Sequence, residues 1–212
     1  MTNGNPNADW EVVSFLTMRK LIGTLGVLLP IVLAVGCIVF GDCQGLLTSI
    51  SAYYGTVMRN VFVGTLFTLA WFFFSYKGYD RRDDVAGDIA CVCALGVALF
   101  PGTATGIIVT MHLISASALF LTLSYFSYFL FTLDDGNPTP EKNRRNNVYR
   151  ACGIIMMSCL VAIPIFLIFL KNTGVAALDP VFWLETFTLW AFGVSWAVKG
   201  ETLWKDATAA SP

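Results

Sequence analysis

Six long apolar stretches follow one another along the chain, separated by short polar segments. A helix that crosses a hydrocarbon core of ~30 Å needs about 20 mostly apolar residues. The stretches that approach this length are residues 21–40, 60–76, 85–103, 106–132, 151–170 and 182–198. The segments between them are too short to hold a second domain. The pattern therefore predicts an all-α polytopic membrane protein, a six-helix transmembrane bundle that forms one domain over residues 1–212.

The lysines and arginines predict how the bundle is oriented, because positive residues are retained on the cytoplasmic side of a membrane. Of the 13 lysines and arginines, only Arg59 and Lys171 fall at one set of span ends. The other set collects Arg19, Lys20, Lys77, Arg81, Arg82, Lys142, Arg144, Arg145, Arg150, Lys199 and Lys205. An even number of spans with both termini in the cytoplasm satisfies this bias. The first span, 21–40, is then expected to serve as an uncleaved targeting signal.

Composition excludes several classes of function. Hydrophobic residues make up 56% of the chain and charged residues only 13%, whereas soluble domains carry roughly a quarter charged residues. A net charge of −1 leaves no basic surface for nucleic acid, and one histidine is too few for a multi-histidine metal centre. We therefore expect no metal, no cofactor and no nucleic-acid partner. The expected location is a membrane, of the bacterial inner-membrane type.

The six cysteines are expected to act as small apolar packing residues rather than as a disulfide framework. Four of them fall within the predicted spans, in their inner halves: Cys91, Cys93, Cys152 and Cys159. Only Cys37 and Cys43 lie toward the predicted outer face. The spacing of Cys91 and Cys93 is also wrong for a redox pair of the Cys-x-x-Cys type.

Two segments are expected to lie outside the spans. Residues 133–150 contain glycine and two prolines before a basic run, which predicts a turn whose basic side chains contact lipid phosphates. Residues 10–18 are expected to form a short interfacial helix before the first span. Pro30 and Pro164 are expected to kink the first and fifth spans.

A small set of polar residues falls near the predicted outer face. Arg59 begins the second span, His112 lies about two turns inside the fourth, and Glu185 about one turn inside the sixth. Ionisable residues in such places are costly, so they are candidates for a functional role. Ser51 and Tyr54 lie in the first outer loop. If the spans pack as a bundle, these five residues can converge at one outward-opening site, and we take them as the candidate ligand-binding residues.

Three interpretations of these residues are possible, and two of them involve no catalysis. In the structural interpretation, Arg59 pairs with Glu185 or Asp42, and His112 donates to a backbone carbonyl or a serine. In the binding interpretation, Arg59 and His112 hold the anionic head group of a lipid or a small anion. Tyr53 and Tyr54 would then line its approach.

The third interpretation is catalytic, with His112 as a general base, oriented by Glu185 and acting on Ser51 or on water. It predicts a lipid-modifying membrane enzyme and is less favoured, because no nucleophile motif surrounds Ser51. A small-molecule transporter is a further alternative, against which the lack of an internal repeat and of mid-membrane charge argues. We therefore assign no catalytic residue, and whether the protein is an enzyme stays open.

Two segments, Ser49–Thr56 and Val61–Leu66, resemble the first outer loop and second span of a six-span membrane family. This family includes the autophagy-modulator proteins and a remodeller of GPI anchors, with uncharacterised bacterial relatives. Its members carry an Ile-Ser-Asp stretch, in which Ala52 replaces the aspartate here, and an early histidine in span four that His112 could match. The resemblance implies six spans and a lipid-facing role at the outer leaflet, with membrane lipid as partner. A homo-oligomer or an unidentified membrane partner stays open.

Overall fold

The computed structural model describes residues 6–78, 80–134, 136 and 138–204, and this part of the chain is all-α without a strand. Its α-helices are α1 (Pro6–Val39), α2 (Arg59–Ser75), α3 (Arg81–Leu99), α4 (Ile107–Tyr125), α5 (Pro140–Ile165) and α6 (Pro180–Lys199). The π-helical turns η2 (Phe126–Leu130) and η3 (Phe166–Leu170) extend α4 and α5. Two 3₁₀ helices, η1 (Ser51–Gly55) and η4 (Gly174–Leu178), lie in loops. The predicted all-α class is thus confirmed.

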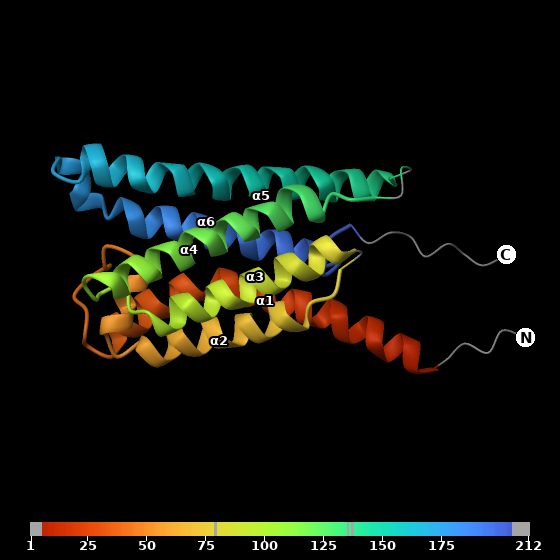
Figure 1. The fold of residues 1–212 in the computed structure, drawn as a ribbon, viewed down its shortest axis with the longest axis horizontal. Helices are drawn as coiled ribbons and strands as arrows, with labels where there is room; N and C mark the ends of the chain where they lie inside the picture. The colour runs from red at the N-terminus through yellow and green to blue at the C-terminus, as the bar shows by residue number, and fades with distance from the viewer. Residues whose placement is uncertain (1–5, 79, 135, 137, 205–212) are drawn as a thin grey trace, which may run out of the picture.

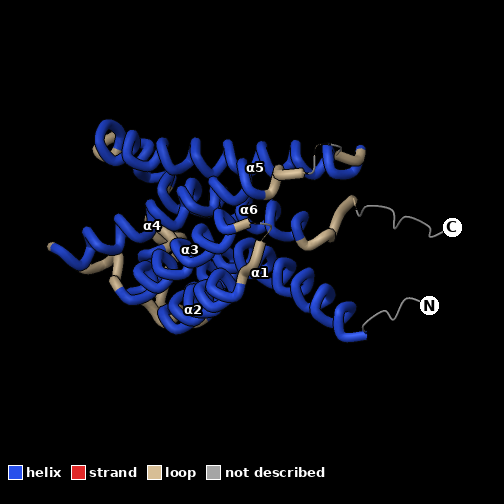
Figure 2. The backbone as a smooth tube through the Cα atoms, turned by 45° about the vertical axis from the view of Figure 1, so that its right-hand side comes forward, coloured by secondary structure: helices blue, strands red, loops and turns tan. Residues whose placement is uncertain are grey.

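The helices form a closed ring in which each packs against its neighbour in sequence and α1 packs against α6. Successive helices run in opposite directions (Figures 1 and 2), so the start of α1 and the end of α6 lie at the same end of the bundle. We call this end, which also carries the α2–α3 and α4–α5 loops, the basic end. The opposite end carries η1, η4 and the loop between α3 and α4, and we call it the η1 end.

The described lysines and arginines separate between these two ends. Arg59 begins α2 and Lys171 follows η3, so both lie at the η1 end. The others belong to the first part of α1, to the loops and helix starts at the basic end, or to the last turn of α6. Lys205 lies outside the described residues. The grouping inferred from the sequence therefore matches the two ends of the bundle.

Among the described residues, four helical segments are long and apolar enough to cross a membrane, so the protein is an integral membrane protein. They are Phe15–Val39, Ile107–Leu130, Pro140–Leu170 and Pro180–Lys199. The α2 helix has 17 residues, about 26 Å of rise, which is short of a ~30 Å hydrocarbon core. The α3 helix begins with four charged residues, Arg81 to Asp84, which lower its apolar character.

Three helix boundaries differ from those predicted. Residues 10–18 are continuous with α1 instead of forming a separate interfacial helix. The α5 helix begins at Pro140, so the basic run predicted as a turn forms its first turns. Thr139 caps this start through a 3.1 Å bond from the Lys142 N–H to its Oγ, and proline suits the first helical position. The α3 helix ends at Leu99, because the residue before Pro101 disfavours helix.

The core at the basic end is built around Trp196 of α6. This side chain is 0% exposed and meets Tyr76 edge-on at 5.1 Å and Phe131 at 5.2 Å between ring centroids. Phe73 and Phe126 pack against it at 5.6 Å each. Edge-to-face aromatic pairs at such distances add to the free energy gained from burial alone. One α6 side chain thus joins the ends of α2 and α4.

The α1 and α6 helices touch through their backbones at Gly23 and Gly193. A Cβ atom added to Gly23 would lie 2.6 Å from the Gly193 carbonyl oxygen, and one added to Gly193 would lie 2.6 Å from the Gly23 carbonyl oxygen. Helices in lipid associate by such close approach at small residues. Neither position 23 nor position 193 can therefore carry a side chain unless the two helices move apart.

We predict that Gly23→Ala lowers the free energy of unfolding by about 1–3 kcal/mol, because the added methyl group must push α6 away. The matched control is Gly64→Ala in α2, where an added Cβ meets no atom within 4 Å. Both changes replace a helical glycine by a better helix former, so the control should unfold at the same or a higher temperature. Thermal unfolding in one detergent measures both, and an equal effect of the two changes would contradict the packing argument.

Candidate functional site

A disulfide closes the chain just after α1. Cys37 and Cys43 are bonded, with their Cα atoms 5.3 Å apart, so the prediction that both are packing residues is wrong. The reason is local: α1 ends at Val39 and the chain turns back, which brings residue 43 beside the last turn of the helix. Asp42, which lies in this turn, ties it to the residues before α2, because the Asp42 Oδ2 atom accepts the Val57 N–H at 2.9 Å. Cys91, Cys93, Cys152 and Cys159 are free, as expected.

Glu185 of α6 anchors η1. Its Oε2 accepts the backbone N–H of Ile50 at 2.6 Å, although the two residues are 135 positions apart. Within the loop, Ser49 Oγ accepts the Ala52 N–H at 3.1 Å and lies 3.2 Å from Ser51 Oγ. Glu185 therefore fixes the start of η1, and with it the position of Ser51.

His112 lies in the second turn of α4, with 3% of its surface exposed. Its Nδ1 lies 2.7 Å from the backbone oxygen of Phe100. A carbonyl oxygen can only accept, so Nδ1 carries the proton and Nε2 holds a lone pair; this tautomer is assigned from the bond. The bond to a backbone carbonyl is the one that the structural interpretation predicted.

Gly102 brings the serine and the histidine to one point. A Cβ atom added to this glycine would lie 2.9 Å from His112 Nε2 and 3.0 Å from Ser51 Oγ. The missing side chain therefore leaves both polar atoms facing the same small space. Sequence reasoning did not single out Gly102, although the Pro101-Gly102 pair after an apolar run was a signal for a tight turn there.

Ser51, His112 and Glu185 line one internal cavity of about 50 Å³. The rest of its wall is apolar: Leu29, Ile50, Phe62, Leu66, Val97, Ala116, Leu119, Phe120 and Leu189. A space of this size with three polar groups suits one or two water molecules and is too small for a head group. Three of the five candidate residues thus meet, around a water-sized space.

Arg59 and Tyr54 line a different pocket, an open one of about 530 Å³ at the η1 end, with Thr56, Pro101 and Thr103. Arg59 Nη2 donates to the Tyr54 hydroxyl at 3.0 Å, and its guanidinium carbon lies 4.6 Å from the centre of the Tyr54 ring. The predicted pairing of Arg59 with Glu185 or Asp42 is therefore wrong. Both carboxylates accept backbone N–H groups, which hold the loop between α1 and α2.

Tyr53 does not line this approach. Its side chain is 0% exposed, its ring packs 6.3 Å from that of Phe182, and its hydroxyl accepts the Leu47 N–H at 3.3 Å. Of the two neighbouring tyrosines, only Tyr54 faces the open pocket. The turn of η1 separates them, because consecutive side chains of a 3₁₀ helix point about a third of a turn apart.

The segment Pro101–Thr103 separates the two pockets. Gly102 faces Ser51 and His112, whereas Pro101 and Thr103 face the pocket of Arg59. The expected single depression is thus an open pocket and an inner cavity on either side of one short loop. Among the described residues, no group of three His, Cys, Asp or Glu side chains could hold a metal ion.

No protein-family model, curated protein or solved structure matches this chain. The class that the structure defines is an all-α integral membrane protein, with four helices able to span a membrane in the part of the chain that the structure describes. The likeness to the six-span family of lipid-facing proteins stays a prediction.

We predict that Glu185→Ala lowers the free energy of unfolding by about 1–3 kcal/mol, because the Ile50 N–H loses its acceptor. Glu185→Gln keeps an acceptor oxygen and should lose less. Asp88→Ala serves as the control, since Asp88 is exposed on α3 and makes no hydrogen bond to a described residue. Denaturant unfolding compares the three, and a stable Glu185→Ala variant would show that η1 needs no anchor.

Proposed function

We propose that this protein is a six-span membrane protein whose η1 end faces outward and binds an anionic group in the pocket of Arg59. The ligand class is a lipid head group or a small anion. The supporting observation for orientation is the separation of charge, with Arg59 and Lys171 at one end and the other described lysines and arginines at the opposite end.

The ring of helices supports six spans. The α2 and α3 helices lie between α1 and α4, both of which are long and apolar enough to cross a membrane. The α3 charges are confined mainly to its first turn, at the basic end, where they can reach the interface. A short α2 with Arg59 at one end and Tyr76 and Lys77 after the other is also consistent with interfacial anchoring.

The observation that carries the proposal is the exposure of Arg59 and its lack of a carboxylate partner among the described residues. The residue is exposed at the wall of the pocket, stacked on Tyr54, and no carboxylate of the described residues pairs with it. A guanidinium has five N–H donors in a rigid fork that matches phosphate and carboxylate oxygens. The bond to Tyr54 uses one donor and holds the side chain in place. The remaining donors are thus presented to a pocket of about 530 Å³, within the usual range for ligand sites.

The test is native mass spectrometry of the full chain in mild detergent. We expect the wild type to retain an adduct of lipid or small-anion mass, and Arg59→Gln to reduce it at least tenfold because the fork of donors is lost. Lys171→Gln removes the other cation of the η1 end and should keep the adduct. Equal adducts in all three proteins, or none in the wild type, would refute the proposal.

A second candidate function is hydrolysis or acyl transfer on a lipid, favoured by the placement of His112 Nε2 and Ser51 Oγ on one point near Gly102. The cavity there has room for only one or two water molecules, so an ester reaches Ser51 only if the Pro101–Thr103 segment moves aside. In such a step the Ser51 oxygen attacks an ester carbonyl and its proton passes to Nε2. The same proton then leaves with the alcohol, and water frees the acyl group from Ser51 by the reverse transfers. Phe100 orients the imidazole, in place of the predicted Glu185.

A small phosphorylating agent such as diisopropyl fluorophosphate tests this candidate without knowledge of the substrate. The Ser51 oxygen would displace fluoride from phosphorus, and its proton would pass to His112. We expect one label, located at Ser51 by peptide mass, whose rate falls at least a hundredfold in His112→Ala. Ser49→Ala is the control for the neighbouring hydroxyl. Labelling elsewhere, or labelling of Ser51 at the same rate in His112→Ala, would exclude the pair as a catalytic unit.

A further inference from the structure

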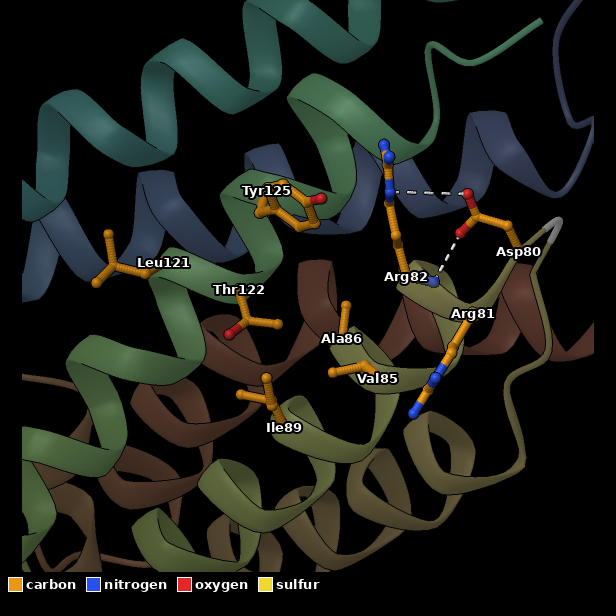
Figure 3. Close-up of a pocket in the computed structure, with 9 residues that line it drawn as sticks. All are labelled: Asp80, Arg81, Arg82, Val85, Ala86, Ile89, Leu121, Thr122 and Tyr125. Carbon is orange, nitrogen blue, oxygen red and sulfur yellow. Dashed lines mark hydrogen bonds and ion pairs between the residues drawn. The ribbon is translucent and has the colours of Figure 1, made fainter.

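A groove of about 840 Å³ runs between α3 and α4 toward the basic end, away from both pockets described above (Figure 3). The wall from α3 consists of Val85, Ala86 and Ile89, and the wall from α4 of Leu121, Thr122 and Tyr125. Asp80, Arg81 and Arg82 lie where the groove reaches the start of α3. We call it the α3–α4 groove.

The walls of the groove are apolar and accessible from outside the bundle. Val85, Ile89 and Leu121 are 47%, 46% and 45% exposed. Thr122 adds no free donor, because its Oγ donates to the Ala118 carbonyl at 2.8 Å. Ala86 is buried at the floor of the groove, and its side chain is too small to fill the space between the two helices. Such a lining suits a hydrocarbon chain better than any polar ligand.

The end of the groove is basic. Arg81 is exposed and makes no hydrogen bond or ion pair with a described residue. Arg82 has Nε at 4.0 Å from Asp80 Oδ2, with side chains 73% and 46% exposed, so this pair is weak. The other oxygen of Asp80 accepts the Arg82 N–H at 2.6 Å and caps α3. The two guanidinium groups project from either side of the helix start, as Figure 3 shows.

We infer that the α3–α4 groove binds a glycerophospholipid with an anionic head group. One acyl chain lies between the helices, and the head group lies at the end that Arg81 and Arg82 flank on opposite sides. Charge complementarity selects this occupant, because an apolar channel that ends in two arginines matches a hydrocarbon chain that ends in a phosphate. The tyrosine hydroxyl of Tyr125 at the same level is a further donor for head-group oxygens. In the proposed orientation this lipid belongs to the cytoplasmic leaflet, where basic residues meet anionic lipids.

This site is separate from the pocket of Arg59, so the two can be tested side by side. The full chain in mild detergent is titrated with phosphatidylglycerol and with phosphatidylethanolamine of the same acyl chains, and bound lipid is counted by native mass spectrometry. The variants are the pair Arg81→Gln with Arg82→Gln, and Ile89→Trp, which fills the groove. The matched control is Arg144→Gln with Arg150→Gln, two exposed arginines of α5 outside the groove.

We expect the wild type to prefer phosphatidylglycerol over phosphatidylethanolamine about tenfold, and the Arg81 and Arg82 pair to lose that preference. The α5 control should keep it. Ile89→Trp should lower binding of both lipids, because it excludes the chain. The arginines are exposed, so their replacement leaves folding intact, and this pair decides the outcome even if Ile89→Trp fails to fold.

Three results would overturn the inference. The first is phosphatidylglycerol binding by the Arg81 and Arg82 pair equal to that of the α5 control. The second is loss of the same adduct in Arg59→Gln alone, which would place the lipid at the η1 end and support the proposed function instead. The third is a dimer that dissociates on Ile89→Trp, since the groove would then be covered by a second copy of the chain. If the Arg81 and Arg82 pair loses the groove lipid but keeps the adduct that depends on Arg59, the result supports both the groove site and the proposed function.

Discussion

Two glycines allow the first and last helices of this protein to touch backbone to backbone, and the arrangement of both ends of the bundle follows from that contact. With Gly23 against Gly193, α6 lies beside α1 along its length, and the ring N–H (Nε1) of Trp190 donates to the Val27 carbonyl at 3.2 Å. Trp196 then lies inside the ring at the basic end. At the other end the same pairing places Glu185 beside the loop that follows α1.

The helices themselves were predictable because lipid demands length and apolarity, which a sequence displays directly. The meeting of Ser51, His112 and Glu185 was also predictable, since all three fall near the same predicted face of the membrane. Depth says nothing about which side of a helix a residue occupies. For that reason the predicted pairing of Arg59 with Glu185 or Asp42 was wrong, and so was the expectation that all five candidate residues share one depression.

Other errors have a local cause. Thr139-Pro140 is both a loop signal and a favourable helix start, and in the structure it begins α5, which packs against α6. Cys37 and Cys43 are separated by a spacing that permits a bond only if the helix stops between them. The carboxylates of Asp42 and Glu185 satisfy backbone N–H groups of a loop. Such loop hydrogen bonds leave no periodic pattern in a sequence.

The bond between Glu185 and Ile50 has a consequence for biosynthesis. Its two partners belong to the loop after the first helix and to the sixth helix, so they emerge from the ribosome 135 residues apart. Until α6 has been inserted, η1 lacks its anchor and the inner cavity lacks one wall. A chain interrupted anywhere before α6 therefore leaves the Ile50 N–H without the acceptor that Glu185 provides.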